Sequence, residues 1–125
     1  MSKPFQIQLT VDFPAGVNAP NATFAVPAGK RLVIEYVSAL AVLATGQRMM
    51  FAQVNTVVAG TLVFHFLKSE SIGTATSTAG EGFLSSQMVK LYADPSTEVL
   101  VSAIRSDATT AGTVTFAVSG YLVAP

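Results

Sequence analysis

The fold class of this chain is decided by the stretch RMMFAQVNTVVAGTLVFHFL, residues 48–67. β-Branched and aromatic residues stand on both sides of Ala59-Gly60, and these residue types fit the pleated surface of a β-strand. We therefore expect two strands, 48–58 and 61–67. The connection is either a tight hairpin turn or a longer loop with Gly60 in the left-handed region, because alanine is unfavourable at positive φ.

Both faces of this expected hairpin are apolar. In the register of a two-residue turn, one face carries Met49, Phe51, Val57, Leu62, Phe64 and Phe66. A strand in a pair of packed sheets needs only one face for its core, so something else should cover the second face. We expect a second copy to cover it; a loop of the same chain is the alternative. The residues expected at this interface are Met50, Val54, Val58, Val63 and Leu67.

The rest of the chain is expected to form short strands separated by turns, because no window keeps apolar residues at helical spacing. The residues expected in these strands are 5–11, 22–26, 31–44, 83–92, 97–105 and 113–123. Residues 68–82, mostly Gly, Ser, Thr and Ala, are expected to form one long loop. The sequence thus predicts an all-β protein with one domain, 1–125, folded as an eight-stranded antiparallel β-sandwich of the jelly-roll kind.

Composition excludes several classes of function. The 125 residues carry zero net charge and only 11% charged side chains, whereas a nucleic-acid binder needs a basic face. With no cysteine and a single histidine, His65, and with scattered acidic residues, we expect no metal and no cofactor. The longest uncharged run is too polar for a membrane span, and no signal-peptide pattern begins the chain. The default expectation is a soluble, cytoplasmic protein.

The residues that could bind a ligand are few. Arg48 and Arg105 lie at strand ends and could hold an anion, although a solvated arginine is the commoner case there. His65 could serve a site or could be a half-buried strand residue with a local partner. The candidate ligand-binding residues are His65, Arg48 and, in the expected loop, Thr74, Thr76 and Ser77. No tryptophan is present to stack on a sugar ring.

Three short runs, 26–32, 91–95 and 119–123, resemble turn-and-strand signatures of small bacterial β-sandwich proteins. The resemblance implies a fold and no mechanism. Three functions stay open. The first is a non-enzymatic β-sandwich module that self-associates, by analogy with other jelly rolls as a trimer, and binds a carbohydrate or a surface partner. The second is a structural protein of a phage or shell, and the third is a small hydrolase or isomerase that uses His65.

Overall fold

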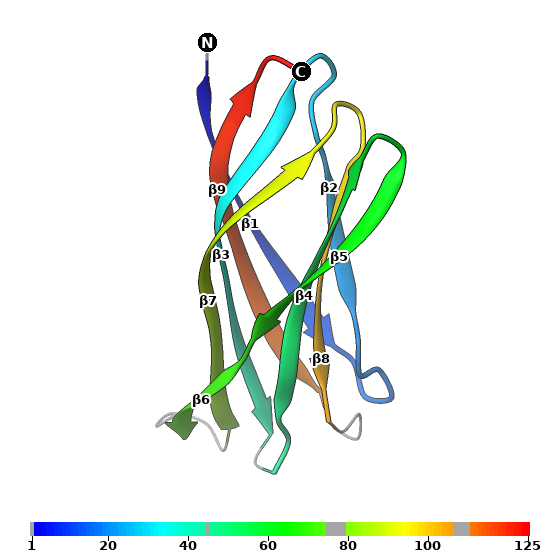
Figure 1. The fold of residues 1–125 in the computed structure, drawn as a ribbon. Coiled ribbons are helices and arrows are strands. Elements are labelled where there is room, and N and C mark those ends of the chain that lie inside the picture. Colours follow the sequence, from blue (N-terminus) through cyan, green and yellow to red (C-terminus); the bar gives the residue numbers. More distant parts are fainter. Residues whose placement is uncertain (1, 45, 75–79, 107–110) are drawn as a thin grey trace.

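The computed structural model describes residues 2–44, 46–74, 80–106 and 111–125, and the regular structure in this part consists of strands (Figure 1). Nine strands are present there: β1 (Lys3–Phe13), β2 (Asn21–Ala25), β3 (Arg31–Ala44), β4 (Met49–Val58), β5 (Thr61–Lys68), β6 (Glu70–Thr74), β7 (Gly80–Ala93), β8 (Glu98–Arg105) and β9 (Gly112–Val123). They form a five-stranded sheet, β1-β9-β3-β7-β6, and a four-stranded sheet, β2-β8-β4-β5, both antiparallel. Within these ranges, no helix could cross a membrane.

The strand pairs are nested along the chain. β1 pairs with β9, β2 with β8, β3 with β7, and β4 with β5. Successive pairs alternate between the five-stranded and the four-stranded sheet. The contacts of β3 with β9 and of β4 with β8 then join the pairs within each sheet. One long antiparallel ribbon, wound back over itself, accounts for this order.

Both sheets contribute to one hydrophobic core. On β3, alternate residues such as Val37, Ala39 and Ala41 are fully buried, and on β8 the same holds for Val99 and Val101. This alternation follows from the period of two in a β-strand, where successive side chains point to opposite faces.

The expected count of eight strands is wrong, because a ninth lies inside the expected loop 68–82. β6 pairs with the beginning of β7, with Glu70 opposite Leu84. β7 also begins earlier than expected, at Gly80. The sequence of β6 is polar and contains a glycine, so its own pattern does not indicate a strand. It forms one because β7 offers it an unpaired edge.

The connection between β4 and β5 is the tight hairpin turn. β4 ends at Val58 and β5 begins at Thr61, so only two residues connect them. Ala59 has φ 52° and Gly60 has φ 76°, both in the left-handed region. Positive φ at both central residues is the requirement of a type I′ turn, whose twist matches that of the flanking strands. This turn fixes the register of β5 against β4.

Candidate functional site

The outer face of the four-stranded sheet is apolar near β5. Leu62, Phe64 and Phe66 are 55%, 51% and 61% exposed. Residues directly opposite each other in an antiparallel pair share one face of the sheet. Phe66 of β5 lies opposite Gln53 of β4. Its ring packs edge to face against the ring of Phe51, also on β4, with 5.5 Å between the ring centroids. We call the following residues the outer apolar face: Phe51, Val57, Leu62, Phe64, Phe66, Leu100 and Ile104.

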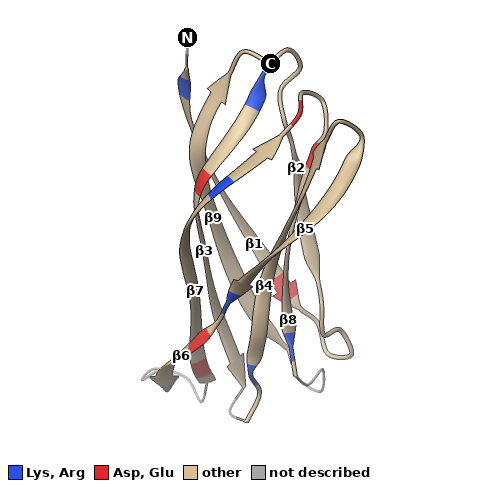
Figure 2. Cartoon of the chain, viewed as in Figure 1, with Lys and Arg blue, Asp and Glu red and all other residues tan. Residues whose placement is uncertain are grey.

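The polar residues within this face are bonded inside the chain. Nε2 of Gln53 donates to Oδ1 of Asn55 at 2.9 Å, and Asn55 itself is 7% exposed. The hydroxyl of Ser102 donates to the carbonyl oxygen of Pro20 at 2.8 Å. The charged residues of the four-stranded sheet, Lys68, Glu98 and Arg105, each lie at the end of a strand. Figure 2 shows no charged residue along β4 or along β5 before Lys68. The face therefore presents mainly apolar side chains to its surroundings.

The structure divides the five residues expected at an interface. Val54 and Leu67 are 0% and 2% exposed and belong to the core, so the prediction that they lie on an outer face is wrong. The reason is register: Val54 lies opposite Val101 of β8, a core residue, which turns this side of the hairpin inward. Both sides of the hairpin are apolar, so the sequence pattern alone could not select the inner one.

The other three expected interface residues are exposed. They are Met50 at 58%, Val58 at 37% and Val63 at 43%. On β5 every residue from Thr61 to Phe64 is exposed, although neighbouring residues point to opposite faces. Both faces of β5 are therefore accessible at its hairpin end.

His65 lies on β5 among these residues, on the inward side. It is half-buried, and its Nε2 lies 3.0 Å from Oγ1 of Thr56. Burial lowers its pKa from the ordinary 6.5, which favours the neutral ring. In the described part of the chain, no carboxylate makes an ion pair with His65, and it does not line the main surface hollows. His65 thus has the local partner typical of a strand residue and lacks the acid that a catalytic pair needs.

Arg48 lies at a different place, beside a hollow of about 370 Å³ near the crossing from β5 to β6. Ser69, Ser71 and Glu81 also line it, and Ser71 donates to Oε2 of Glu81 at 2.8 Å. The hydroxyl of Ser69 is buried and has no hydrogen-bond partner among the described residues. This hollow offers a cation, a carboxylate and hydroxyls to a small polar ligand, but His65 does not line it.

Of the three candidate residues in the expected loop, Thr74 ends β6 and lies opposite Glu81. Thr76 and Ser77 lie outside the described residues. The expected loop 68–82 thus contains strand residues at both ends: Glu70–Thr74 form β6, an edge strand of the five-stranded sheet, and 80–82 belong to β7.

Arg105 has a structural role that the sequence did not indicate. At the end of β8 it is 1% exposed, and its guanidinium lies 4.7 Å above the ring of Phe13. Nε and Nη2 donate to the carbonyl oxygen of Val17 at 3.0 and 2.7 Å, and Nη2 also donates to that of Pro14 at 3.0 Å. Nη1 donates to Oε1 of Gln47 at 3.0 Å. Arg105 thus fixes the loop after β1 and is not exposed to an external anion.

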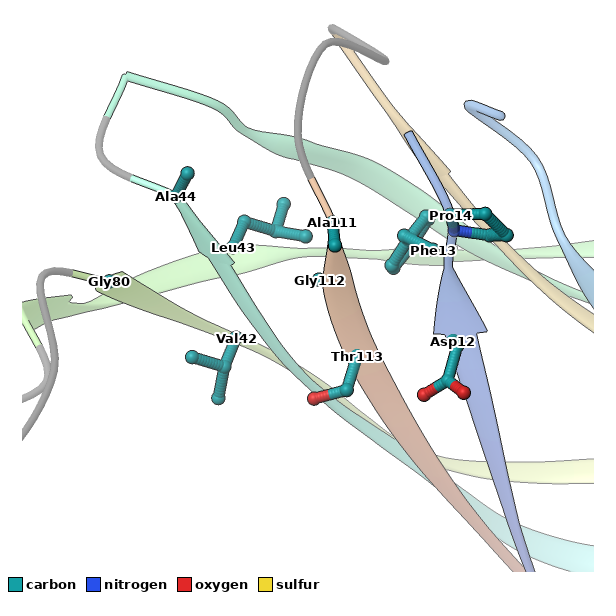
Figure 3. A pocket seen from close by; sticks show the side chains of 10 residues that line it. All are labelled: Asp12, Phe13, Pro14, Val42, Leu43, Ala44, Gly80, Ala111, Gly112 and Thr113. Atoms are coloured by element: carbon teal, nitrogen blue, oxygen red, sulfur yellow. The ribbon is translucent and has the colours of Figure 1, made fainter. Parts of the chain in front are cut away.

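A hollow of about 670 Å³ lies where the ends of β1, β3, β7 and β9 meet (Figure 3). Asp12 is the one titratable residue among its lining residues; Thr113 of β9 lies opposite Asp12, and Val42 of β3 lies on the far side of Thr113. Leu43 and Phe13 form its apolar part. A single carboxylate with no neighbouring base, nucleophile or cation in this lining does not make an acid–base pair.

No group of three or more potential metal-ligating residues occurs within the described ranges. A comparison with models of protein families finds none that matches the chain, and a comparison with curated proteins finds no match either. The features that could carry a function in the described residues are thus the outer apolar face and the surface hollows.

Proposed function

We propose that this protein is a non-enzymatic module of the jelly-roll kind that self-associates, so that its role is to build a homo-oligomeric assembly. The observation that carries the proposal is the outer apolar face beside β5. Leu62, Phe64 and Phe66, each more than half exposed, form one row on it. Contiguous apolar surface of this kind is uncommon on soluble monomers and marks a protein interface.

The nested pairing supports the jelly-roll description. In a jelly roll, a long antiparallel ribbon winds so that consecutive strand pairs fall alternately into two facing sheets. The pairs β1·β9, β2·β8, β3·β7 and β4·β5 follow that rule, with β6 as an addition beside β7. The inward-facing residues of both sheets belong to one core, as two packed sheets require.

A second copy of the chain is the partner that the face fits best. Interfaces between identical subunits are more apolar than other interfaces and depleted of charge. β4 carries no charged residue, and β5 carries only Lys68, at its end. A partner of strong opposite charge would find nothing to pair with here, whereas an identical apolar face is complementary to it.

The surroundings of His65 and Asp12 favour assembly over catalysis as the function. His65 has Thr56 as its local partner, and the 670 Å³ hollow at the ends of β1, β3, β7 and β9 holds Asp12 alone among titratable residues. A hydrolase would need a nucleophile, a base and an oxyanion donor around one cavity. We therefore assign the function to the outer apolar face and not to a catalytic cavity.

A carbohydrate ligand is a second candidate, supported by one further hollow. This hollow, about 410 Å³ on the five-stranded sheet, is lined by uncharged residues that include Gln6, Gln8, Tyr36 and Ser119. The Tyr36 hydroxyl is 2.6 Å from the Ser86 hydroxyl, which orients it. Amides and hydroxyls of this kind can bind sugar hydroxyls. Loss of binding to a glycan array in Tyr36→Ala would support this site, and a chain that binds no glycan would exclude it.

The experiment that tests assembly is a mass measurement by multi-angle light scattering on two matched variants. Phe66→Glu places a charge on the outer apolar face, where burying it without a partner is costly, so we expect a single species near the 13.0 kDa of one chain. Met88→Glu changes a residue that is 77% exposed on the other sheet, and should keep the mass of the parent. A parent chain that is monomeric at micromolar concentration would contradict the proposal.

A further inference from the structure

β5 is an unpaired edge that differs from the other three edges of the two sheets. It has one neighbour, β4, so half of its backbone amides and carbonyls face away from any strand. Its eight residues contain no proline, its register with β4 has no bulge, and its only charge is Lys68 at the end. Such an edge is a template for another strand.

Each of the other edges carries a feature that discourages pairing. β1 contains Pro4 and is charged near both ends, at Lys3 and Asp12. β2 has only five residues. β6 is equally short, begins with Glu70 and has an irregular register beside β7. Proteins protect sheet edges with these devices. Among the four edge strands described, β5 has only a terminal charge, Lys68, and neither a proline, nor an irregular register, nor a length of only five residues.

We propose that β5 pairs with β5 of a second copy, antiparallel and edge to edge, around a two-fold axis beside Phe64. This inference rests on the proposed self-association and assigns a contact to the edge of the sheet, where the β5 row of the outer apolar face, Leu62, Phe64 and Phe66, meets its copy. Backbone hydrogen bonds would then join two four-stranded sheets into one continuous sheet, the mode by which extended strands are added to open edges. A two-fold contact between identical patches closes on itself and is the commonest symmetry of homo-oligomers.

The side chains select this register. A two-fold axis perpendicular to the sheet pairs residues that share a face, so one residue, from the outer face or from the inward side, must lie opposite its own copy. With Phe64 in that place, Leu62 of one copy faces Phe66 of the other, and Val63 faces His65 on the other side of the sheet. Apolar side chains thus meet along the whole row, as cross-strand pairs in stable sheets do.

Neighbouring registers are less favourable. With Phe66 on the axis, Lys68 would lie opposite Phe64 of the second copy, in the middle of the apolar row. With Leu62 on the axis, Phe66 would lie opposite residue 58, beyond the end of the partner's β5. The Phe64 register instead sets Lys68 opposite Gly60, at the margin of the contact. With Val63 on the axis, Phe66 would lie opposite Gly60, outside the partner's β5, and with His65 on the axis, Lys68 would lie opposite Leu62. The Phe64 register therefore gives the longest apolar overlap that keeps Lys68 away from apolar residues.

The absence of cysteine from the sequence allows a direct test, because a single introduced cysteine can bond only to its copy. Directly opposed Cα atoms in an antiparallel pair are about 4.5–5.5 Å apart, within the roughly 4.4–6.8 Å that a disulfide spans. Phe64→Cys should therefore form a dimer on a non-reducing gel after mild oxidation. Leu62→Cys and Phe66→Cys should each stay monomeric on the gel, and should cross-link when the two variants are mixed.

A second pair of variants keeps Phe64 in place. Val63→Cys mixed with His65→Cys should give a mixed disulfide, while neither should cross-link alone. If all these variants fail to cross-link, or cross-link in another pattern, while light scattering still finds the parent assembled, edge pairing in this register is wrong and the proposed self-association stands. A monomeric parent would overturn both.

Discussion

The backbone amide of Ala59 donates a hydrogen bond to Oδ2 of Asp94 at 2.7 Å, which joins the β4–β5 hairpin to the turn after β7. The amide of Asp94 in turn donates to the carbonyl oxygen of Val57 at 2.9 Å. Oδ1 of Asp94 accepts from Nε of Arg31 at 3.1 Å. One carboxylate thus helps to fix the turn from which β5 begins, although this turn contains an alanine in an unfavourable conformation.

Ala59→Gly should stabilise the protein. Ala59 has φ 52°, where a Cβ is unfavourable, and glycine keeps the amide that Asp94 binds. We expect the free energy of unfolding in urea to rise by about 0.5–1 kcal/mol, because the relief of strain exceeds the added backbone entropy of glycine.

The control is the neighbouring position. Gly60 has φ 76° and no atom near the place of a Cβ, so Gly60→Ala tests conformation without a steric clash. It should lower the free energy of unfolding by about 1 kcal/mol. If both substitutions changed the free energy of unfolding in the same direction, positive φ would not control the stability of this turn.

Asp94 should make the protein sensitive to acid. The hydrogen bond from Ala59, followed by the hydrogen bond and charge of Arg31, holds the pKa of its carboxyl below the ordinary 3.8. The folded state therefore favours the charged form, and this contribution to stability is fully present above pH 3.8. It is lost as the pH falls through the lowered pKa of the folded protein.

Asp94→Asn isolates this effect. The variant should be less stable than the parent at neutral pH, and the difference in thermal midpoint should shrink as the solution is acidified below 3.8. A difference that stays constant over this range would mean that the charge of Asp94 does not contribute.

Arg105→Lys should be strongly destabilising, although it keeps the charge. An ammonium group cannot reach the carbonyl oxygens of Val17 and Pro14 and the amide of Gln47 in the planar arrangement that the guanidinium uses. Hydrogen bonds to a buried charged group contribute about 1.5–3 kcal/mol each, so we expect a loss of at least about 2 kcal/mol in urea unfolding.

Arg48→Lys provides the matched comparison, since Arg48 is exposed. It should change the free energy of unfolding by less than about 0.5 kcal/mol. If both substitutions have the same small effect, Arg105 does not hold the loop after β1 in the way the hydrogen bonds indicate.

The sequence predicted the strands where periodicity or turn residues were clear. The alternation from Phe5 to Val11 and the turn residues around Gly29 and Pro95 gave β1 and the ends of β2 and β7 nearly in place. β6 escaped prediction because an edge strand needs only backbone hydrogen bonds, which polar and small residues form as well as apolar ones. Its pairing partners on β7 lie seven to fourteen residues further along the chain, and the pattern of 70–74 itself does not reveal them.

The sequence showed that both faces of the 48–67 hairpin are apolar, but it did not show which of the two faces points into the core. That choice depends on which side of β4 meets β8, a contact between residues such as Val54 and Val101 that lie far apart in sequence. The burial of Arg105 could not be predicted from the sequence either. Its partners are mainly backbone carbonyl oxygens, which every residue type supplies. A strand-end arginine looks the same whether it is solvated or enclosed.

His65 should produce a second, milder pH dependence nearer neutrality. Burial lowers its pKa from 6.5, so the unfolded chain takes up a proton at higher pH than the folded protein does. Stability should therefore fall as the pH decreases from 6.5 to the lower pKa of the folded state, and level off below it. His65→Gln, which can keep a hydrogen bond to Thr56 but does not titrate, should lose this step in urea unfolding over the same pH range. A step of equal size in the variant, or a gain of stability on acidification in the parent, would contradict the prediction.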